Sequence, residues 1–324
     1  MSRDRDRIPA PLAHLEGARP PAPEWFERAL AQAPERTRHD VQGAHIEALT
    51  WGEIGKPGLL LLHGNGAHAD WYSFIAPLLA DDFRVVALSW SGMGGSDWRA
   101  SYSLDLYVAE AFGVAEATGL FASAVKPVFA GHSFGSFPTL ACAARAGERL
   151  RGVIAIDMPL HTPEELKARE QRRSDREGRR ERFAGAPRPA RIYRTEAEAL
   201  ARFRFAPPQA CANLFVADHI ARTSLKRARD EDGHEGWTWR FDPFLWRGYK
   251  MSNPARDLAA ARCPVALIRG ARSKLVPDAA FAYARSLAPG DAPAIDIADA
   301  DHHVMVDQPL EFCTALRQAT AGWS

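Results

Sequence analysis

The stretch VFAGHSFGS at residues 128–136 decides how the rest of the chain is interpreted. A short apolar run ends there in Gly-x-Ser-x-Gly, with Ser133 at the centre and Gly131 and Gly135 two residues to either side. Glycine at both places suits a sharp turn from a strand into a helix, because a larger side chain would collide with the neighbouring strand or helix. Such a turn holds the Ser133 hydroxyl above the sheet and points the backbone N–H of Phe134 toward an oxyanion formed beside it.

The composition of the 324-residue chain is that of a globular protein. A hydrophobic content of 46% is enough to bury a sizeable core, and a formal net charge of +1 gives no argument for binding nucleic acid or a membrane surface. The four cysteines lie far apart, without C-x-x-C or metal-ligand spacing, so we expect reduced thiols in a cytoplasmic protein. Neither a signal-peptide pattern nor an apolar run of about 18 residues occurs, which predicts no secretion and no membrane span.

Continuous apolar runs predict strands that are buried on both faces of a parallel sheet. They lie at 58–62, 83–89, 128–132, 151–157, 263–270 and, more weakly, 294–297, and two opening strands are expected within 38–51. Apolar residues at helical spacing predict helices at 24–33, 69–79, 104–119, 138–148 and 310–319. The fold class is therefore α/β, a doubly wound and mostly parallel eight-stranded sheet. A glycine-rich loop at 91–97 lacks the G-x-G-x-x-G register, so no nucleotide cofactor is expected.

The alternation of strands and helices breaks from about residue 160 to 254, where the predicted elements are charged or aromatic helices. We expect a core formed by 24–159 and 255–324, interrupted by this insertion. Residues 1–23 mix charges with prolines and are expected to form a flexible or draped tail. The excess of basic residues between 161 and 194 is more typical of a solvated helix face than of a site for an anionic partner.

A serine nucleophile needs a base within hydrogen-bond reach, and that base needs an orienting acid. Ser133, Asp157 and His302 follow predicted strands in the order nucleophile, acid, base. Through these residues the chain resembles the α/β-hydrolase superfamily from about residue 36 to the end. Further motifs that carry the resemblance lie at 63–66, 91–97 and 300–309. The resemblance implies a sheet of α/β-hydrolase type with a helical cap at 160–254, inserted after the sixth strand.

One departure from the superfamily pattern concerns the acid. In most members it lies in a G-x-x-D pattern after the strand at 265–269, but here that position is Ser273. A serine cannot stabilise an imidazolium as a carboxylate does, so we expect Asp157 to supply the acid. The resemblance supports this choice, because a subset of haloalkane dehalogenases carries its acid after the corresponding strand. Asp278 is a weaker alternative that more readily starts a helix, and Asp157 itself would otherwise be a helix or turn cap.

The resemblance also places the base and the oxyanion hole. His302 stands seven residues before Pro309, where the superfamily has its catalytic histidine, and the adjacent His303 is the alternative. Neighbouring histidines point in different directions and no ligand set accompanies them, so no metal is expected. The backbone N–H groups of Asn65 and Phe134 are the implied oxyanion hole.

The sequence thus predicts a serine hydrolase that cleaves a carboxylic ester, lactone or related acyl substrate through an acyl-enzyme. Alternatives on the same fold are C–C bond hydrolysis, acyl transfer, perhydrolysis, or a non-catalytic ligand receptor, which the missing acid at Ser273 favours. Dehalogenation and epoxide opening are disfavoured, because an ether formed on serine has no carboxyl carbon for water to attack. We expect an apolar small molecule as substrate. Aromatic and apolar residues of the insertion should form its core for the most part, with some facing the serine: Phe203, Phe205, Trp237, Trp239, Phe241, Phe244, Leu245 and Trp246.

Overall fold

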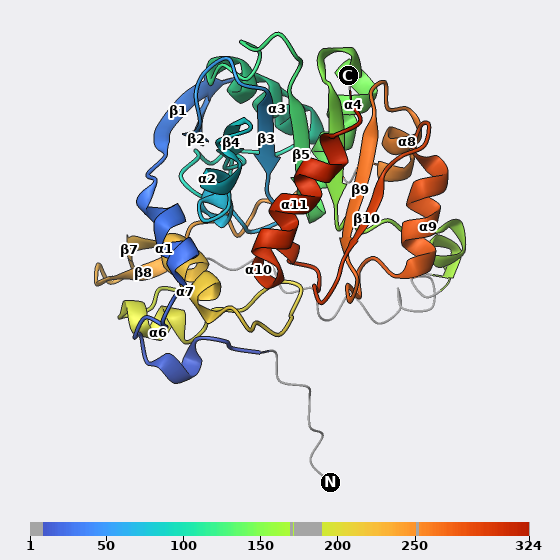
Figure 1. Cartoon of the computed structure of the whole chain (residues 1–324). Coiled ribbons are helices and arrows are strands. Elements are labelled where there is room, and N and C mark those ends of the chain that lie inside the picture. Colours follow the sequence, from blue (N-terminus) through green and yellow to red (C-terminus); the bar gives the residue numbers. More distant parts are fainter. Residues whose placement is uncertain (1–8, 169–170, 172–189, 251–252, 324) are drawn as a thin grey trace.

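A computed structural model describes residues 9–168, 171, 190–250 and 253–323 of the chain (Figure 1). At its centre is an eight-stranded sheet of order β1-β2-β4-β3-β5-β6-β9-β10. The β1–β2 and β2–β4 pairs are antiparallel, and the other neighbours pair in parallel, which confirms the predicted fold class. The strands are β1 (Glu35–Val41), β2 (Ala44–Trp51), β3 (Gly58–Leu62), β4 (Arg84–Leu88), β5 (Val128–His132), β6 (Gly152–Ile156), β9 (Val265–Gly270) and β10 (Ala294–Ile297).

Central strands of this sheet are buried on both faces. In β3, Leu59 and Leu61 belong to one core cluster and Leu60 and Leu62 to another, because successive side chains of a strand point to opposite faces. One face is covered by α1 (Glu24–Ala31), α2 (Ala76–Leu79), α10 (Val304–Asp307) and α11 (Pro309–Thr320). The other is covered by α3 (Leu104–Ala117), α4 (Ser136–Ala146), α8 (Pro254–Ala259) and α9 (Asp278–Leu287). The apolar runs of the sequence are therefore the middle layer of a three-layer fold.

The segment between β6 and β9 contains α6 (Glu196–Leu200), α7 (Leu214–Thr223) and an antiparallel hairpin of β7 (Leu225–Arg229) and β8 (Glu235–Trp239). The hairpin is an addition to the predicted helices. We call residues 160–254 the inserted segment. It contacts the loop after β4, where Met93 bridges to Phe241 and the Gly94 N–H donates to the Arg240 carbonyl at 2.8 Å. The charged helix expected between Arg169 and Arg182 lies almost entirely outside the described residues.

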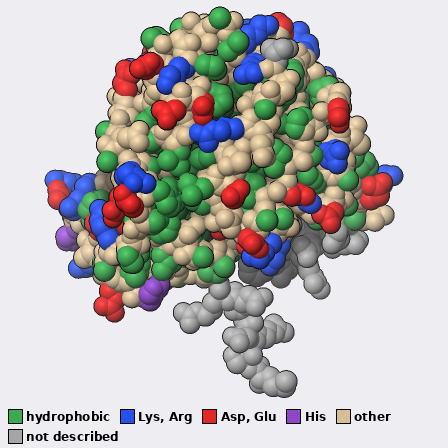
Figure 2. Space-filling view, viewed as in Figure 1, with side chains coloured by type: hydrophobic (Ala, Val, Ile, Leu, Met, Phe, Trp, Pro, Cys, Tyr) green, Lys and Arg blue, Asp and Glu red, His purple; other side chains and the backbone are tan. Residues whose placement is uncertain are grey.

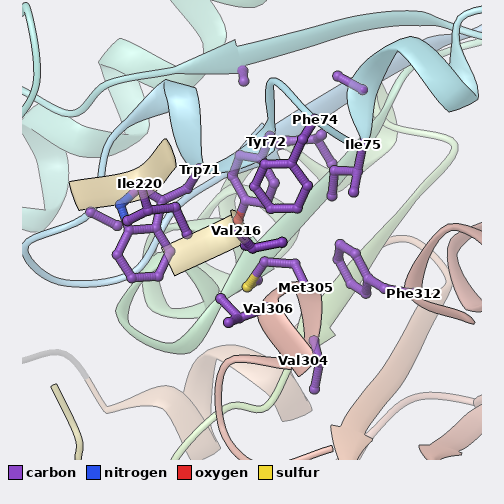
Figure 3. Close-up of a cluster of buried hydrophobic side chains, with 14 of the residues drawn as sticks. Trp71, Tyr72, Phe74, Ile75, Val216, Ile220, Val304, Met305, Val306 and Phe312 are labelled. Carbon is purple, nitrogen blue, oxygen red and sulfur yellow. The ribbon is translucent and has the colours of Figure 1, made fainter. Parts of the chain in front are cut away.

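Buried side chains tie the inserted segment to the body of the protein. Figure 3 shows Val216 and Ile220 of α7 in one cluster with Trp71 and with Met305 of α10. All four are at most 7% exposed, and Val216 and Ile220 are fully buried. Burial of this kind contributes about 1.5–3 kcal/mol for each large aliphatic side chain, so α7 is part of the core and not a loosely attached element.

The described part of the predicted N-terminal tail, residues 9–23, lies against the inserted segment. Leu12 is 2% exposed, and a Cβ on Gly17 would lie 2.7 Å from the Ala197 side chain. The Gly17 carbonyl also accepts a hydrogen bond from Arg222 Nη2 at 2.7 Å. Over these residues the segment is therefore packed against α6 and α7 and does not hang free, because the apolar Leu12 side chain finds a buried site there.

One predicted helix is split. The sequence predicts a helix over 69–79, whereas the structure has a 3₁₀ turn at Ala69–Tyr72 followed by α2. Pro77 explains the interruption, because in a continuous helix its ring would clash with the carbonyl four residues earlier, but it is tolerated in the first turn of α2. The other predicted helices and strands of the core occur where expected, with ends displaced by a few residues.

The surface carries charges of both signs. Figure 2 shows acidic and basic side chains interspersed over one face of the molecule, without a large patch of a single sign. Among the helices of the described residues, we find none whose length and apolarity would let it cross a membrane.

Candidate active site

The Gly-x-Ser-x-Gly motif forms the sharp turn that the sequence predicts. β5 ends at His132, Ser133 adopts a left-handed φ of 52°, and α4 begins at Ser136. A Cβ on Gly131 would lie 2.2 Å from the Thr139 hydroxyl, and a Cβ on Gly135 would lie 2.4 Å from a backbone carbonyl of β3. Both glycines are therefore required by close packing. The turn leaves the Ser133 side chain partly exposed above the sheet.

Ser133, His302 and Asp157 form one hydrogen-bonded chain. His302 Nε2 lies 2.9 Å from Ser133 Oγ, and His302 Nδ1 lies 2.5 Å from Asp157 Oδ2. Because a carboxylate only accepts hydrogen bonds, Nδ1 carries the proton and Nε2 is left to accept from the serine hydroxyl. His302 is 3% exposed and Asp157 is fully buried. The structure thus brings together the three side chains that the sequence singles out.

Asp157 is held in place by two further donors from the loop after β9. The Gly270 N–H donates to Oδ1 at 2.9 Å, and the Ser273 hydroxyl donates to Oδ2 at 2.6 Å. Ser273 stands where most of the superfamily has its acid, and here it contacts the carboxylate that comes from β6. Asp278, the alternative acid, has a side chain 95% exposed and pairs with Arg269 instead of a histidine.

His303, the alternative base, has a different environment. It is 3% exposed, and its ring packs against Trp71 and Phe205 at centroid distances of 5.4 and 5.2 Å. Burial, together with the neighbouring His302 and His132, lowers the pKa of His303 well below its usual range, so the ring stays neutral. The structure places His302, and not His303, against the Ser133 hydroxyl.

A third histidine joins this group, which the sequence does not indicate. The metal-ligating atoms of His132, His302 and His303 all lie within 4.8 Å of one another. However, His132 Nε2 donates to the His302 carbonyl at 2.9 Å, and both ring nitrogens of His302 are hydrogen-bonded. A metal ion could take all three ligands only by replacing one of the two bonds that His302 makes, to Ser133 or to Asp157. The donor set therefore fits a hydrogen-bonded network better than a metal centre.

The loop after β3 passes directly beside the serine. A Cβ on Gly64 would lie 3.2 Å from Ser133 Cβ, which places the next residue, Asn65, at the edge of the site. His63 holds this loop: its Nδ1–H donates to the Gly64 carbonyl at 2.7 Å, and its Nε2 accepts from the Trp90 N–H at 3.0 Å. Burial lowers the pKa of His63 to about 3, so it keeps this neutral, bridging form.

Gln209 of the inserted segment clamps the loop that carries His302, and sequence reasoning missed it. Its Oε1 accepts from the His303 N–H at 2.9 Å, and its Nε2 donates to both Asp307 carboxylate oxygens at 3.0 Å. Asp307 in turn accepts from the Asp301 N–H at 2.8 Å. No motif surrounds Gln209 in the sequence, so no local signal could have found it.

A cavity of about 380 Å³ lies between the loop of Asn65 and the inserted segment. Ser133 is not part of its wall, but Asn65 and Gly66 are, and Trp246 in the wall packs against Phe134 at a centroid distance of 5.2 Å. Most of the eight aromatic and apolar residues of the insertion were expected in its core, but more of them than expected line this cavity. The five that do are Phe203, Trp239, Phe241, Leu245 and Trp246. This cavity is the candidate location for the apolar substrate that the sequence predicts.

The sheet order and the turn after β5 define the class of the protein as an α/β-hydrolase fold. A model of the alpha/beta hydrolase family matches residues 59–315, so the chain belongs to this family. Among curated proteins it is 28% identical over 258 residues to a 2-(acetamidomethylene)succinate hydrolase of Mesorhizobium japonicum, covering 76% of this chain and 82% of that protein. It is also 34% identical over 122 residues to epoxide hydrolase 4 of Mus musculus, covering 36% of this chain and only 32% of that protein.

Solved structures share the fold at lower sequence identity. The crystal structure of E-2-(acetamidomethylene)succinate hydrolase has a TM-score of 0.68 and 21% identity, covering 89% of this chain and 100% of that chain. A thioesterase domain from the curacin biosynthetic pathway has a TM-score of 0.67 and 21% identity, covering 88% and 99%. An esterase of Mycobacterium tuberculosis has a TM-score of 0.63 and 22% identity, covering 95% and 96%. These likenesses concern the fold alone.

Proposed function

We propose that the protein is a serine hydrolase that cleaves a carboxylic ester, a lactone or a related acyl substrate. The observation that carries the proposal is the hydrogen-bonded chain from Ser133 through His302 to Asp157. As Ser133 Oγ attacks the acyl carbon, His302 Nε2 takes its proton, and the Asp157 carboxylate stabilises the resulting imidazolium. His302 then gives the proton to the leaving group. In the second half of the reaction His302 takes a proton from water, the water attacks the acyl carbon, and the proton passes to Ser133 Oγ as the acid product is released.

The backbone N–H groups of Asn65 and Phe134 are the proposed oxyanion hole. The close approach of Gly64 to Ser133 supports this assignment for the first, and the position of Phe134 directly after the nucleophile supports it for the second. Preorganised donors of this kind typically contribute about 10²–10³ in kcat each. The hydrogen bonds of His63 keep the loop rigid, which is what such a hole requires.

Names of the similar proteins include an esterase, a thioesterase and an epoxide hydrolase. Ser133 at the nucleophile position favours acyl chemistry over epoxide opening, because only an ester on the nucleophile can be hydrolysed at its own carbonyl carbon. A receptor without turnover would not need the short contact between His302 and Asp157, which prepares a base for proton transfer.

Two further parts of the proposal concern the surroundings of the site. The inserted segment acts as a cap, since its residues wall the cavity beside Asn65. A cytoplasmic location is supported by four cysteines that are all free thiols.

The test is turnover of p-nitrophenyl acetate and butyrate by the purified protein, with Ser133→Ala as the key variant. Ser101→Ala is the matched control, because Ser101 is exposed on the surface. We expect Ser133→Ala to lose ester turnover and labelling by a fluorophosphonate probe, while Ser101→Ala keeps both. Undiminished turnover in Ser133→Ala would refute the nucleophile, and absence of turnover and labelling in the wild type would refute the proposed function.

A further inference from the structure

The cavity beside Asn65 carries an excess of positive charge. Three arginines line it, Arg202, Arg204 and Arg240, against one carboxylate, Asp242. Asp242 is 8% exposed, and its two oxygens accept hydrogen bonds from the Tyr102 hydroxyl at 2.7 Å and from the Phe244 N–H at 2.8 Å. Its carboxylate is thus occupied by neutral donors and forms no ion pair with the arginines among the described residues. The chain as a whole is nearly neutral, so this is a local feature.

Arg240 is fixed in place and still has donors to offer. Its Nη1 donates to the Thr223 carbonyl at 3.1 Å, and its side chain is 22% exposed. Its Nη2 lies 3.7 Å from Glu47 Oε1, which is too long for a hydrogen bond. Glu47 already accepts hydrogen bonds from Arg36 at 2.6 Å and from Ser89 at 2.8 Å. Glu47 therefore orients the Arg240 guanidinium by charge alone, and the N–H groups of Arg240 that do not bond to Thr223 stay available to a ligand.

Arg202 supplies a second guanidinium at the same cavity. It follows α6 and is exposed, and within the described part of the chain its side chain makes no hydrogen bond or ion pair. Arg204 lies beside it, with Nη1 donating to the Phe203 carbonyl at 2.7 Å. Two arginines are thus available to a ligand, one rigid and one adaptable, and a planar guanidinium matches a carboxylate in geometry and charge.

Most of the remaining wall is apolar, and its other polar side chains, His68 and Ser224, are hydrogen-bonded to each other at 2.8 Å. A ligand that spans the cavity would therefore have an acyl group at Asn65, a hydrocarbon middle part and an anionic end. The carboxylate of Asp242 in the same wall disfavours a phosphate dianion, because like charges in a partly buried site repel, and this leaves a monoanion.

We infer that the substrate carries a carboxylate distal to its scissile acyl carbon, and that Arg202 and Arg240 bind this carboxylate. The inference rests on the proposed function, since Ser133 must be the nucleophile for the acyl carbon to lie beside Asn65. It narrows the substrate class from esters in general to monoesters or related acyl derivatives of dicarboxylic acids.

The experiment compares two esters that differ only in charge: mono-p-nitrophenyl glutarate and its methyl ester. We expect the wild type to favour the carboxylate in kcat/KM by about tenfold to a hundredfold, as one or two charge-assisted hydrogen bonds would give. Arg202→Gln and Arg240→Gln should each lower this ratio about tenfold, and Arg240→Lys, which keeps the charge, should lower it less. Arg285→Gln is the matched control, because it makes the same change on the exposed face of α9.

A binding measurement separates this inference from the proposed function. Glutarate itself is titrated calorimetrically into Ser133→Ala, with and without Arg240→Gln, and we expect the second substitution to weaken binding about tenfold. If the wild type hydrolyses both esters with equal kcat/KM, the inference is overturned and the proposed function stands. If it hydrolyses neither, the proposed function fails, and glutarate binding that Arg240→Gln weakens would still support the anion site. Absence of glutarate binding would overturn it.

Discussion

Separate substitutions of Asp157 and Ser273, which meet beside His302, distinguish the proposed catalytic acid from the residue that only holds it in place. In Asp157→Asn the amide keeps one acceptor oxygen, but its nitrogen donates. It therefore cannot accept both from the Gly270 N–H, as Oδ1 does now at 2.9 Å, and from the Ser273 hydroxyl and His302 Nδ1–H, as Oδ2 does at 2.6 and 2.5 Å. The imidazolium formed during proton transfer also loses its counter-charge. We expect kcat to fall by about 10⁴, the scale known for the acid of a serine triad, which corresponds to about 5.4 kcal/mol in the activation barrier.

Ser273→Ala should give the opposite pattern. Asp157 keeps its charge, its bond to His302 and its bond from the Gly270 N–H at 2.9 Å, so the orientation of the imidazole is retained. We expect kcat to stay within about tenfold of the wild type. The protein should nevertheless unfold more easily, by about 1.5–3 kcal/mol, because a buried carboxylate loses one of its three donors.

The assay is kcat and kcat/KM with p-nitrophenyl butyrate, paired with urea unfolding of the same preparations. A double variant, Asp157→Asn with Ser273→Asp, provides the positive control, since a carboxylate at 273 starts from a position already in contact with the acid. It should recover at least about tenfold over Asp157→Asn alone. If Asp157→Asn stays within tenfold of the wild type while Ser273→Ala loses a thousandfold, the acid is not Asp157 and the reasoning is wrong.

Gln209→Leu should lower kcat about tenfold and destabilise the fold by about 1–3 kcal/mol, measured by ester turnover and urea unfolding, because the His303 N–H and Asp307 lose their partner. Burial raises the pKa of Asp307 from 3.8 to about 6, so its contribution to stability is complete below pH 3.8 and is lost as the pH rises through 6. Asp307→Asn should remove that part of the pH dependence in urea unfolding; an unchanged slope between pH 4 and 6 would contradict it. Gly135→Ala should destabilise by about 3 kcal/mol, because its Cβ would meet a carbonyl oxygen at 2.4 Å, whereas Gly322→Ala, with nothing within 4 Å, should be neutral.

The core of the fold could be predicted from the sequence because its strands are buried on both faces. The run that forms β3 has no polar side chain at any position. A strand with one face in solvent, or an amphipathic helix, would carry polar residues at regular intervals, so such a run predicts a strand buried on both faces. The carboxyl ends of parallel strands meet at one edge, so side chains that follow β5 and β6 could be expected to lie near each other. Ser133 and Asp157 could therefore be placed together from the sequence, and the motif around His302 indicates the third residue.

What could not be predicted depends on contacts between distant segments. The hairpin β7–β8 has a polar first strand that reads LKRAR, and part of its packing comes from Arg227, which lies 4.2 Å from the centre of the Trp237 ring. Gln209 contacts residues almost a hundred positions away in the sequence. Arg202 and Arg240, which line the same cavity, are 38 positions apart. Each is an ordinary polar residue in its local sequence, and only the folded inserted segment gives it a role.

The proposed nucleophile and the proposed acid share a strained backbone conformation at the ends of two neighbouring strands. Ser133 and Asp157 both have left-handed φ values, 52° and 44°, directly after the paired residues His132 and Ile156 of β5 and β6. Such conformations cost of order 1–3 kcal/mol for a non-glycine residue and persist only where the surroundings hold them. At Asp157 they are held by its own N–H on the Ile268 carbonyl at 2.7 Å and by the Gly270 N–H on its carboxylate. β9 thus positions the proposed acid although it does not supply it, and this explains how a carboxylate lies beside His302 although residue 273 is a serine.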